Sequence, residues 1–392
     1  MCTEVFERVA EPNIESSMGR HDLDNEDYQW LLGALGGPGA GTPHDVLGRP
    51  SADRPQLYLP LGTRDAGTAA LRRYHDGRTR LERMKTRAGI WSARLGMLRF
   101  APGDRTQIGP FAVVERIAQV LGEEDLEVAV TLGPRRRNRK PVLQLLRPNG
   151  STIGFAKVGW SPFAASLVEN EADWLDRLKG NVPSNIEIPR VLARINDGER
   201  LVVVTSPLQT SPRAGVSGRI SASTITRLAR SLGTIEVGFD ELPYLDVLRS
   251  GRVGRLIDVD RLVDVHADTT IELGTWHGDL TPWNTSTSGG VSKVWDWEFA
   301  DIDRPVGFDL LHNAFELVRR QVSKNEEAAL VAVRDRAHVL LASSGQPTKA
   351  VIDLYLCELI MREARLRGEG WHPTDLGPLE RHAVDMLNRR LA

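Results

Sequence analysis

The pattern of hydrophobic and polar positions changes near residue 108 and again near residue 207. Between these points, β-rich runs alternate with turn-like segments such as GPRRRNRK and RPNG. The expected elements are a helix at 111–121, strands at 127–132, 142–146 and 152–158, a helix at 163–178, and strands at 187–195 and 201–205. This order predicts a small α+β lobe over residues 106–207.

Beyond Pro207 the pattern is mostly helical, with long helices at 326–342 and 350–366 and one loop–strand unit at 276–299. A chain of 392 residues exceeds what one hydrophobic core usually supports, so a second lobe at 208–392 is expected. The first 105 residues are expected to be an N-terminal extension, either a cap or a partner-binding segment. It comprises a loose polar start to residue 25, a Gly/Pro-rich loop at 36–43, a strand at 56–60 and an arginine-rich amphipathic helical segment at 68–96.

Composition narrows the classes of function. The net charge of −2 provides no field that would attract nucleic acid or an anionic membrane, so neither is expected as a partner. No run approaches the roughly 18 apolar residues of a membrane span, and the N-terminus has no secretory signal pattern. Cys2 and Cys357 offer no disulfide framework or metal motif. A soluble, cytoplasmic protein is therefore predicted.

Candidate chemistry is concentrated between residues 276 and 309, in WHGDLTPWN and VWDWEFADIDRPVGFD. Phosphoryl transfer needs one carboxylate that receives or orients the acceptor hydroxyl. It also needs oxygen ligands that hold Mg²⁺ against a nucleoside triphosphate. Asp279 is the candidate base, and Asn284 and Asp296 are the candidate metal ligands.

These residues resemble the His-Gly-Asp-x4-Asn loop and the metal-binding Asp of the aminoglycoside phosphotransferase/choline kinase-like family, which has a protein-kinase-like bilobal fold. The resemblance covers roughly residues 125–392, and segments such as FAKVGW and GDLTPWN are similar to actinobacterial phosphotransferase-like proteins. It implies an α+β fold with a small β-rich N-lobe, a mainly helical C-lobe and an extra N-terminal segment. It also implies an ATP- or GTP-dependent kinase that acts on a hydroxyl group.

By this resemblance, a lysine of the third strand holds the nucleotide phosphates and a helix acid orients it. Lys157 is the only charge in GFAKVGW, and Glu171 shares the apolar helix face of Val168 and Leu175. The alternative is that Glu169 or Asp173 forms a surface pair while Lys157 extends to solvent.

The rest of the nucleotide site follows from the resemblance alone. It places Thr205 and Pro207 in the interlobe linker that meets the nucleobase. The segment that begins at Gly133 and ends at Lys140 is either the phosphate loop or an exposed hairpin. His277 and Asp309 are expected to be structural residues of the catalytic loop.

A small acceptor is favoured because only twelve residues separate Asp296 from Asp309, too few for a protein-kinase activation segment. A sugar, an aminoglycoside-like or a choline-like hydroxyl is the expected acceptor. Glu316 and Glu358 could meet it, although Glu358 and Arg362 have the spacing of an ordinary helix ion pair. A peptide- or protein-modifying kinase and an inactive nucleotide-binding scaffold are the alternatives.

Overall fold

The computed structural model describes residues 26–41, 43–49, 57–74, 88–100, 104–133, 137–198, 200–209, 220–322, 325–367 and 376–392. The expectations for residues 1–25, for 75–87 of the arginine-rich helical segment and for 134–136 of the Gly133–Lys140 segment lie outside these residues. The chain divides into two compact units. The first comprises residues 1–169 and 191–207, and the second comprises 170–190 and 208–392.

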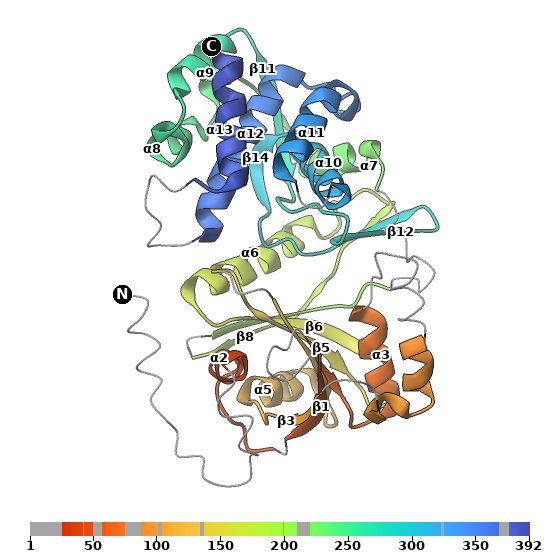
Figure 1. Ribbon diagram of the computed structural model, residues 1–392. Coiled ribbons are helices and arrows are strands. Elements are labelled where there is room, and N and C mark those ends of the chain that lie inside the picture. Colours follow the sequence, from red (N-terminus) through yellow and green to blue (C-terminus); the bar gives the residue numbers. More distant parts are fainter. Residues whose placement is uncertain are drawn as a thin grey trace. The chain divides into compact units, whose positions relative to one another are not determined.

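An eight-stranded antiparallel sheet organises the first unit (Figure 1). Its strand order is β3-β1-β2-β4-β5-β6-β9-β8. The strands are β1 (His44–Arg49), β2 (Leu57–Pro60), β3 (Asp104–Ile108), β4 (Glu127–Leu132), β5 (Pro141–Leu146), β6 (Thr152–Gly159), β8 (Val191–Asp197) and β9 (Arg200–Thr205). The three runs first recognised in the sequence are thus β4, β5 and β6, at the centre of the sheet.

The N-terminal extension contributes directly to this sheet. Strand β2 pairs with β4, with Tyr58 opposite Val130, and β1 and β3 continue the sheet beyond β2. Strands β1 and β2 of the extension therefore share a sheet with the strands of 106–207, and β3 (Asp104–Ile108) crosses the boundary expected at residue 105.

Helices cover both faces of the sheet. The helices of this unit include α2 (Glu26–Ala34), α3 (Arg64–Tyr74), a helical segment at residues 88–94, the 3-10 helix η1 (Met97–Phe100) and α5 (Ala112–Leu121). Helix α6 (Pro162–Leu178) begins in this unit and ends in the second. Tyr58 and Val130 belong to the hydrophobic core under α2 and α5, whereas Leu57 and Ala129 belong to the core under α3. Because successive side chains point to opposite faces, strands covered on both faces are apolar throughout, as β2 is.

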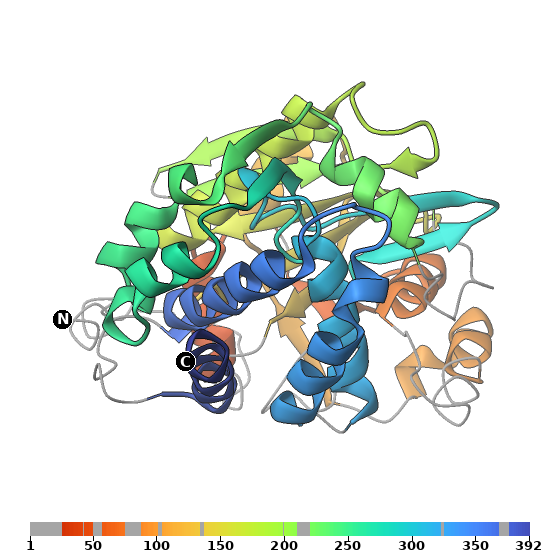
Figure 2. The ribbon, with the colours of Figure 1, turned by 90° about the horizontal axis from the view of Figure 1, so that it is seen from above.

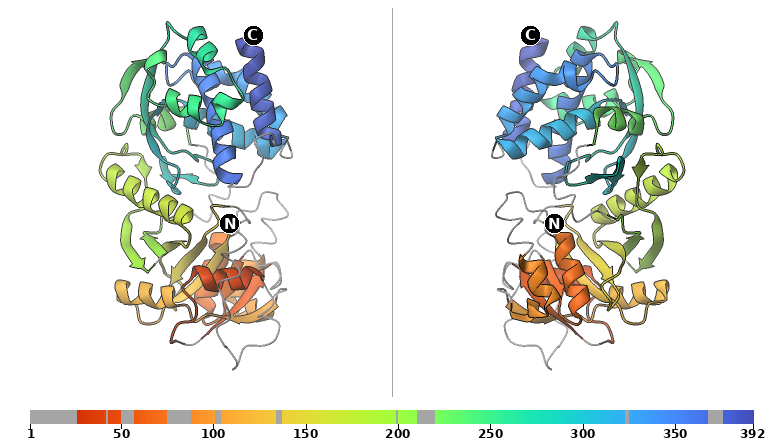
Figure 3. Two further views of the ribbon diagram at one scale, coloured as in Figure 1. Left: turned by 90° about the vertical axis from the view of Figure 1, so that its left-hand side faces the viewer. Right: turned by 90° about the vertical axis from the view of Figure 1, so that its right-hand side faces the viewer.

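The second unit is mainly helical (Figure 2). Its elements before the loop at residues 277–284 are β7 (Ile186–Glu187), α7 (Ala222–Ala229), β10 (Ile235–Gly238), η2 (Phe239–Glu241), α8 (Leu245–Ser250), η3 (Val253–Arg255), α9 (Val259–Val265) and β11 (Thr270–Trp276). Those after it are β12 (Thr285–Ser288), β13 (Val291–Val294), β14 (Asp301–Pro305), α10 (Phe308–Gln321), α11 (Glu326–Leu340), α12 (Thr348–Arg367) and α13 (Pro378–Leu391). Helices α12 and α13 pack against each other, as the views of Figure 3 show in blue.

One expectation for this unit was wrong. The sequence pattern indicated a single loop–strand interruption, but β10, β11 and β14 form a further antiparallel sheet. Strand β10 has only four residues, of which none is buried, so no hydrophobic pattern marked it. The expected combination of a β-rich unit and a mainly helical unit is confirmed. None of the described helices is long and apolar enough to cross a lipid bilayer.

Candidate active site

The loop that follows β11 is held in place by buried side chains. Asp309, in the first turn of α10, accepts hydrogen bonds from the backbone N–H groups of His277 (2.9 Å) and Gly278 (3.3 Å). Burial nevertheless raises the pKa of Asp309 to about 7. Gly278 has a φ of 81°, and a Cβ there would lie 2.2 Å from the Phe299 carbonyl oxygen, so only glycine fits. The structural interpretation of Asp309 is confirmed.

His277 is a structural residue of the same loop. Its Nε2 lies 3.1 Å from the Trp295 carbonyl oxygen, and its Nδ1 accepts the backbone N–H of Asp279 at 3.2 Å. These contacts fit a neutral imidazole with the proton on Nε2, because a second proton would face the N–H donor. Burial lowers the pKa of His277 to about 4, although the charges of Asp279 and Asp296 oppose this shift.

This lowered pKa predicts a pH dependence of stability. Between the ordinary histidine pKa of 6.5 and the folded value of about 4, the unfolded chain binds the proton and the folded chain does not. The contribution of His277 to the free energy of unfolding should therefore fall by about 3 kcal/mol as the pH is lowered from about 6.5 to about 4. The measurement is denaturant unfolding of wild type and His277→Gln from pH 4 to 8. If the free energies of unfolding of wild type and His277→Gln differ by the same amount at every pH in this range, the prediction is contradicted.

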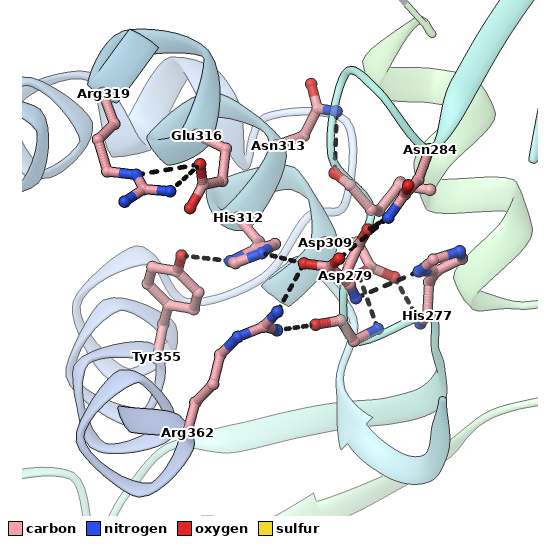
Figure 4. A network of polar contacts seen from close by, with 12 residues as sticks. His277, Asp279, Asn284, Asp309, His312, Asn313, Glu316, Arg319, Tyr355 and Arg362 are labelled. Carbon is pink, nitrogen blue, oxygen red and sulfur yellow. Dashed lines mark hydrogen bonds and ion pairs between the residues drawn. The ribbon is translucent and has the colours of Figure 1, made fainter. Parts of the chain in front are cut away.

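Asp279 lies at the centre of a polar network (Figure 4). Its Oδ1 accepts from Arg362 Nη2 at 2.6 Å and lies 3.3 Å from His312 Nε2. Burial would raise the pKa of Asp279, but Arg362 and His312 outweigh it and hold the pKa well below its usual range. The side chain is still 17% exposed, so a hydroxyl group can reach this ionised carboxylate.

Asn284 contacts the same carboxylate. Its Nδ2 donates to Asp279 Oδ2 and to the Asp279 backbone carbonyl, both at 3.0 Å. With the nitrogen engaged, the amide oxygen is the atom that remains for a cation. Carboxylate and amide oxygens are the ligands that Mg²⁺ prefers.

A second group of carboxylates surrounds Asp296. One oxygen each from Glu171, Asp296 and Glu298 lie within 4.8 Å of one another. Asp296 follows β13 and has a φ of 72°, in the left-handed region that Asp tolerates better than most residues. Asn170 Nδ2 donates to the backbone carbonyls of Glu298 (3.0 Å) and Ala300 (2.9 Å), which ties this part of α6 to the segment carrying Asp296.

The remaining predicted residues lie in the first unit. Lys157 is half-buried in β6, between Val142 of β5 and Val203 of β9. Thr205 ends β9 and Pro207 follows it. Since Lys157 and Glu171 belong to different units, their pairing stays a prediction.

Gly133 follows β4 and accepts a hydrogen bond from Arg139 Nε at 3.0 Å. Arg139 also stacks 4.0 Å from the Trp30 ring centre, and Lys140 is buried. Arg139 of the Gly133–Lys140 segment is thus engaged within the first unit.

The structure also shows polar residues that sequence reasoning missed. The expected Glu358–Arg362 helix pair is wrong, because Arg362 binds Asp279 while Glu358 pairs with Arg365 at 2.5 Å. Glu316 pairs with Arg319 at 2.8 Å.

His312 and Glu298 were not predicted as site residues. His312 lies three residues after Asp309, and Glu298 lies two residues after Asp296, but no local sequence pattern indicated their partners.

No protein-family model matches the chain, and no curated protein matches it. Solved structures align with it at low identity. The GDP complex of wild-type aminoglycoside 2'-phosphotransferase-IIIa is 15% identical over 71% of this chain and 97% of its own, with a TM-score of 0.42. A thermostable mutant of aminoglycoside phosphotransferase APH(4)-Ia with ADP and hygromycin B is 13% identical over 71% and 98%, with a TM-score of 0.44.

A choline/ethanolamine kinase family protein from Mesorhizobium loti is 17% identical over 68% of this chain and 87% of its own, with a TM-score of 0.35.

Proposed function

We propose that this protein is a phosphotransferase that moves the γ-phosphate of a Mg²⁺-bound nucleoside triphosphate, ATP or GTP, to a hydroxyl of a small molecule in the cytoplasm. The observation that carries the proposal is the arrangement of Asp279 and Asn284 in one loop. An ionised, reachable carboxylate is held there by an amide whose oxygen can bind a cation.

In this proposal Asp279 receives the acceptor hydroxyl, and Asn284 and Asp296 hold Mg²⁺, which neutralises phosphate charge. Lys157 contacts the phosphates, and Glu171 orients Lys157. The backbone at Gly133 and the segment Thr205–Pro207 contribute to the nucleotide site.

The acceptor is proposed to be small because the chain between the two aspartates is short. Strand β14 and the start of α10 occupy most of the connection from Asp296 to Asp309. No segment is left there that could bind an extended peptide in the manner of an activation loop. A sugar, an aminoglycoside-like or a choline-like compound fits this proposal.

Thermal melting with ATP or GTP, each with and without Mg²⁺, tests the proposal. A nucleotide that binds only the folded state raises the melting temperature. A Mg²⁺-dependent rise supports the nucleotide site and justifies a screen of hydroxyl acceptors. No shift with either nucleotide at concentrations on the order of 1 mM would contradict it.

Asp296→Asn should weaken Mg²⁺-dependent nucleotide binding. Asn also tolerates the positive φ at this position, so the change removes charge without adding backbone strain. Loss of a residue that only hydrogen-bonds a metal ligand typically lowers metal affinity about 10–100-fold, and loss of the ligand itself should cost at least as much. Calorimetric titration with Mg·ATP measures it, with the exposed Asp268→Asn as matched control. Equal affinities in the two variants would remove Asp296 from the metal site.

A further inference from the structure

Two helices from the C-terminal half of the chain converge on the carboxylate of Asp279 (Figure 4). Helix α10 contributes His312, and α12 contributes Arg362. These positions are 33 and 83 residues from Asp279 in the chain. Their contacts are all within the second unit.

The two carboxylate oxygens are used unequally. Oδ1 meets Arg362 Nη2 at 2.6 Å and His312 Nε2 at 3.3 Å, whereas Oδ2 accepts only Asn284 Nδ2, at 3.0 Å, among the described residues. A carboxylate offers about four lone-pair positions. One position therefore remains, and it is on Oδ2.

We propose that Arg362 and His312 are positioning residues that fix the rotation of the Asp279 carboxylate, so that the remaining position on Oδ2 receives the acceptor hydroxyl. This inference rests on the proposed phosphotransferase function. In the transfer step the acceptor O–H bond breaks and its proton goes to Oδ2. The acceptor oxygen bonds to the γ-phosphorus, and the nucleoside diphosphate leaves with the electrons of the broken bridging bond.

Arg362 is itself held from several sides. Its Nη1 donates to the Gly278 backbone carbonyl, and its guanidinium lies 4.9 Å from the Phe299 ring centre. The planar guanidinium thus binds the backbone and the carboxylate of one loop with two different nitrogens. A lysine ammonium lacks two nitrogens in a fixed planar arrangement, so it cannot make both contacts in one geometry.

His312 is oriented by a third residue. Its Nδ1 lies 3.0 Å from the Tyr355 hydroxyl, which is buried in α12. When Tyr355 donates to Nδ1, the imidazole carries its proton on Nε2 and donates to Asp279 while remaining neutral. Burial raises the pKa of Tyr355 well above its usual value, so the hydroxyl stays a donor.

The test compares Arg362→Met with Arg365→Met. Arg365 lies on the same helix and pairs with Glu358, and its side chain is 47% exposed. The assay measures phosphate release from Mg·ATP and Mg·GTP with water as the acceptor. We expect Arg362→Met to lower kcat by about 10–100-fold with an unchanged nucleotide KM, because misplacement of a reacting group by about 1 Å has effects of this size. Arg365→Met should keep the wild-type kcat and nucleotide KM.

Two further variants separate positioning from folding. Guanidinium ion should restore activity to Arg362→Ala in a saturable manner and should do nothing for Asp279→Asn. His312→Gln, whose amide nitrogen can still donate, should retain more activity than His312→Leu. A merely structural role would produce neither pattern.

The outcomes are distinguishable. A wild-type protein that releases no phosphate from either nucleotide overturns the proposed transfer and this inference with it. A wild type that is active, beside an Arg362→Met variant within twofold of it, overturns the inference alone. The inference alone is also overturned if Arg362→Met is folded, as shown by a nucleotide-dependent melting shift, and its loss of activity is a raised nucleotide KM with an unchanged kcat.

Discussion

Replacing Asp279 by asparagine is expected to lower phosphoryl transfer by about 10²–10⁴-fold, the range typical for loss of a general base. The amide can occupy the same space, but it cannot accept the hydroxyl proton, and it places an N–H₂ group or a weaker acceptor opposite Arg362 and His312. Mg²⁺-dependent nucleotide affinity should change little, since Asp279 is not a proposed metal ligand. Steady-state phosphate release and calorimetric titration measure the two effects separately.

The matched control is Asp260→Asn, which makes the same change at a side chain that is 83% exposed on α9. It should leave both measurements unchanged. If Asp279→Asn transfers phosphate at the wild-type rate, Asp279 is not the base. If it loses nucleotide binding as well as transfer, its role is in the nucleotide site instead.

The largest effect on stability is expected at the ion pair between Arg252 and Glu380. Arg252 Nε lies 2.6 Å from Glu380 Oε1, and the two side chains are 6% and 0% exposed. Glu380 also accepts the Gly377 backbone N–H at the start of α13. Glu380→Gln removes the carboxylate charge that faces this buried guanidinium, and a change of this kind typically costs about 3–5 kcal/mol. The melting temperature should fall on the order of 10 °C.

Two controls define the origin of this loss. The double variant Arg252→Met, Glu380→Leu removes both charges, and it should recover most of the stability, because apolar replacement of a whole buried pair is often neutral. Disruption of the exposed Arg249–Asp260 pair by Asp260→Ala should cost about 1 kcal/mol or less. A Glu380→Gln loss as small as that of Asp260→Ala would show that the buried pair is not a major source of stability.

Local pattern was sufficient for the elements whose hydrophobic side chains repeat along the chain. The segments expected at 127–132 and 163–178 correspond to β4 (Glu127–Leu132) and α6 (Pro162–Leu178). The sheet of β10, β11 and β14 escaped prediction because its strands are far apart in the chain and β10 has no buried residue. Likewise, nothing local indicated that β2 would pair with β4 and so join the N-terminal extension to the central sheet.

The candidate site divides in the same way. Sequence alone identified Asp279, Asn284 and Asp296 as candidates. All three lie in one loop and the hairpin that follows it, so their spacing can be recognised without knowledge of the fold. Tertiary structure alone decided that Arg362 binds Asp279 rather than Glu358. Helical spacing allows several ion pairs of similar energy, and the packing of α12 beside the loop that follows β11 determines which of them forms.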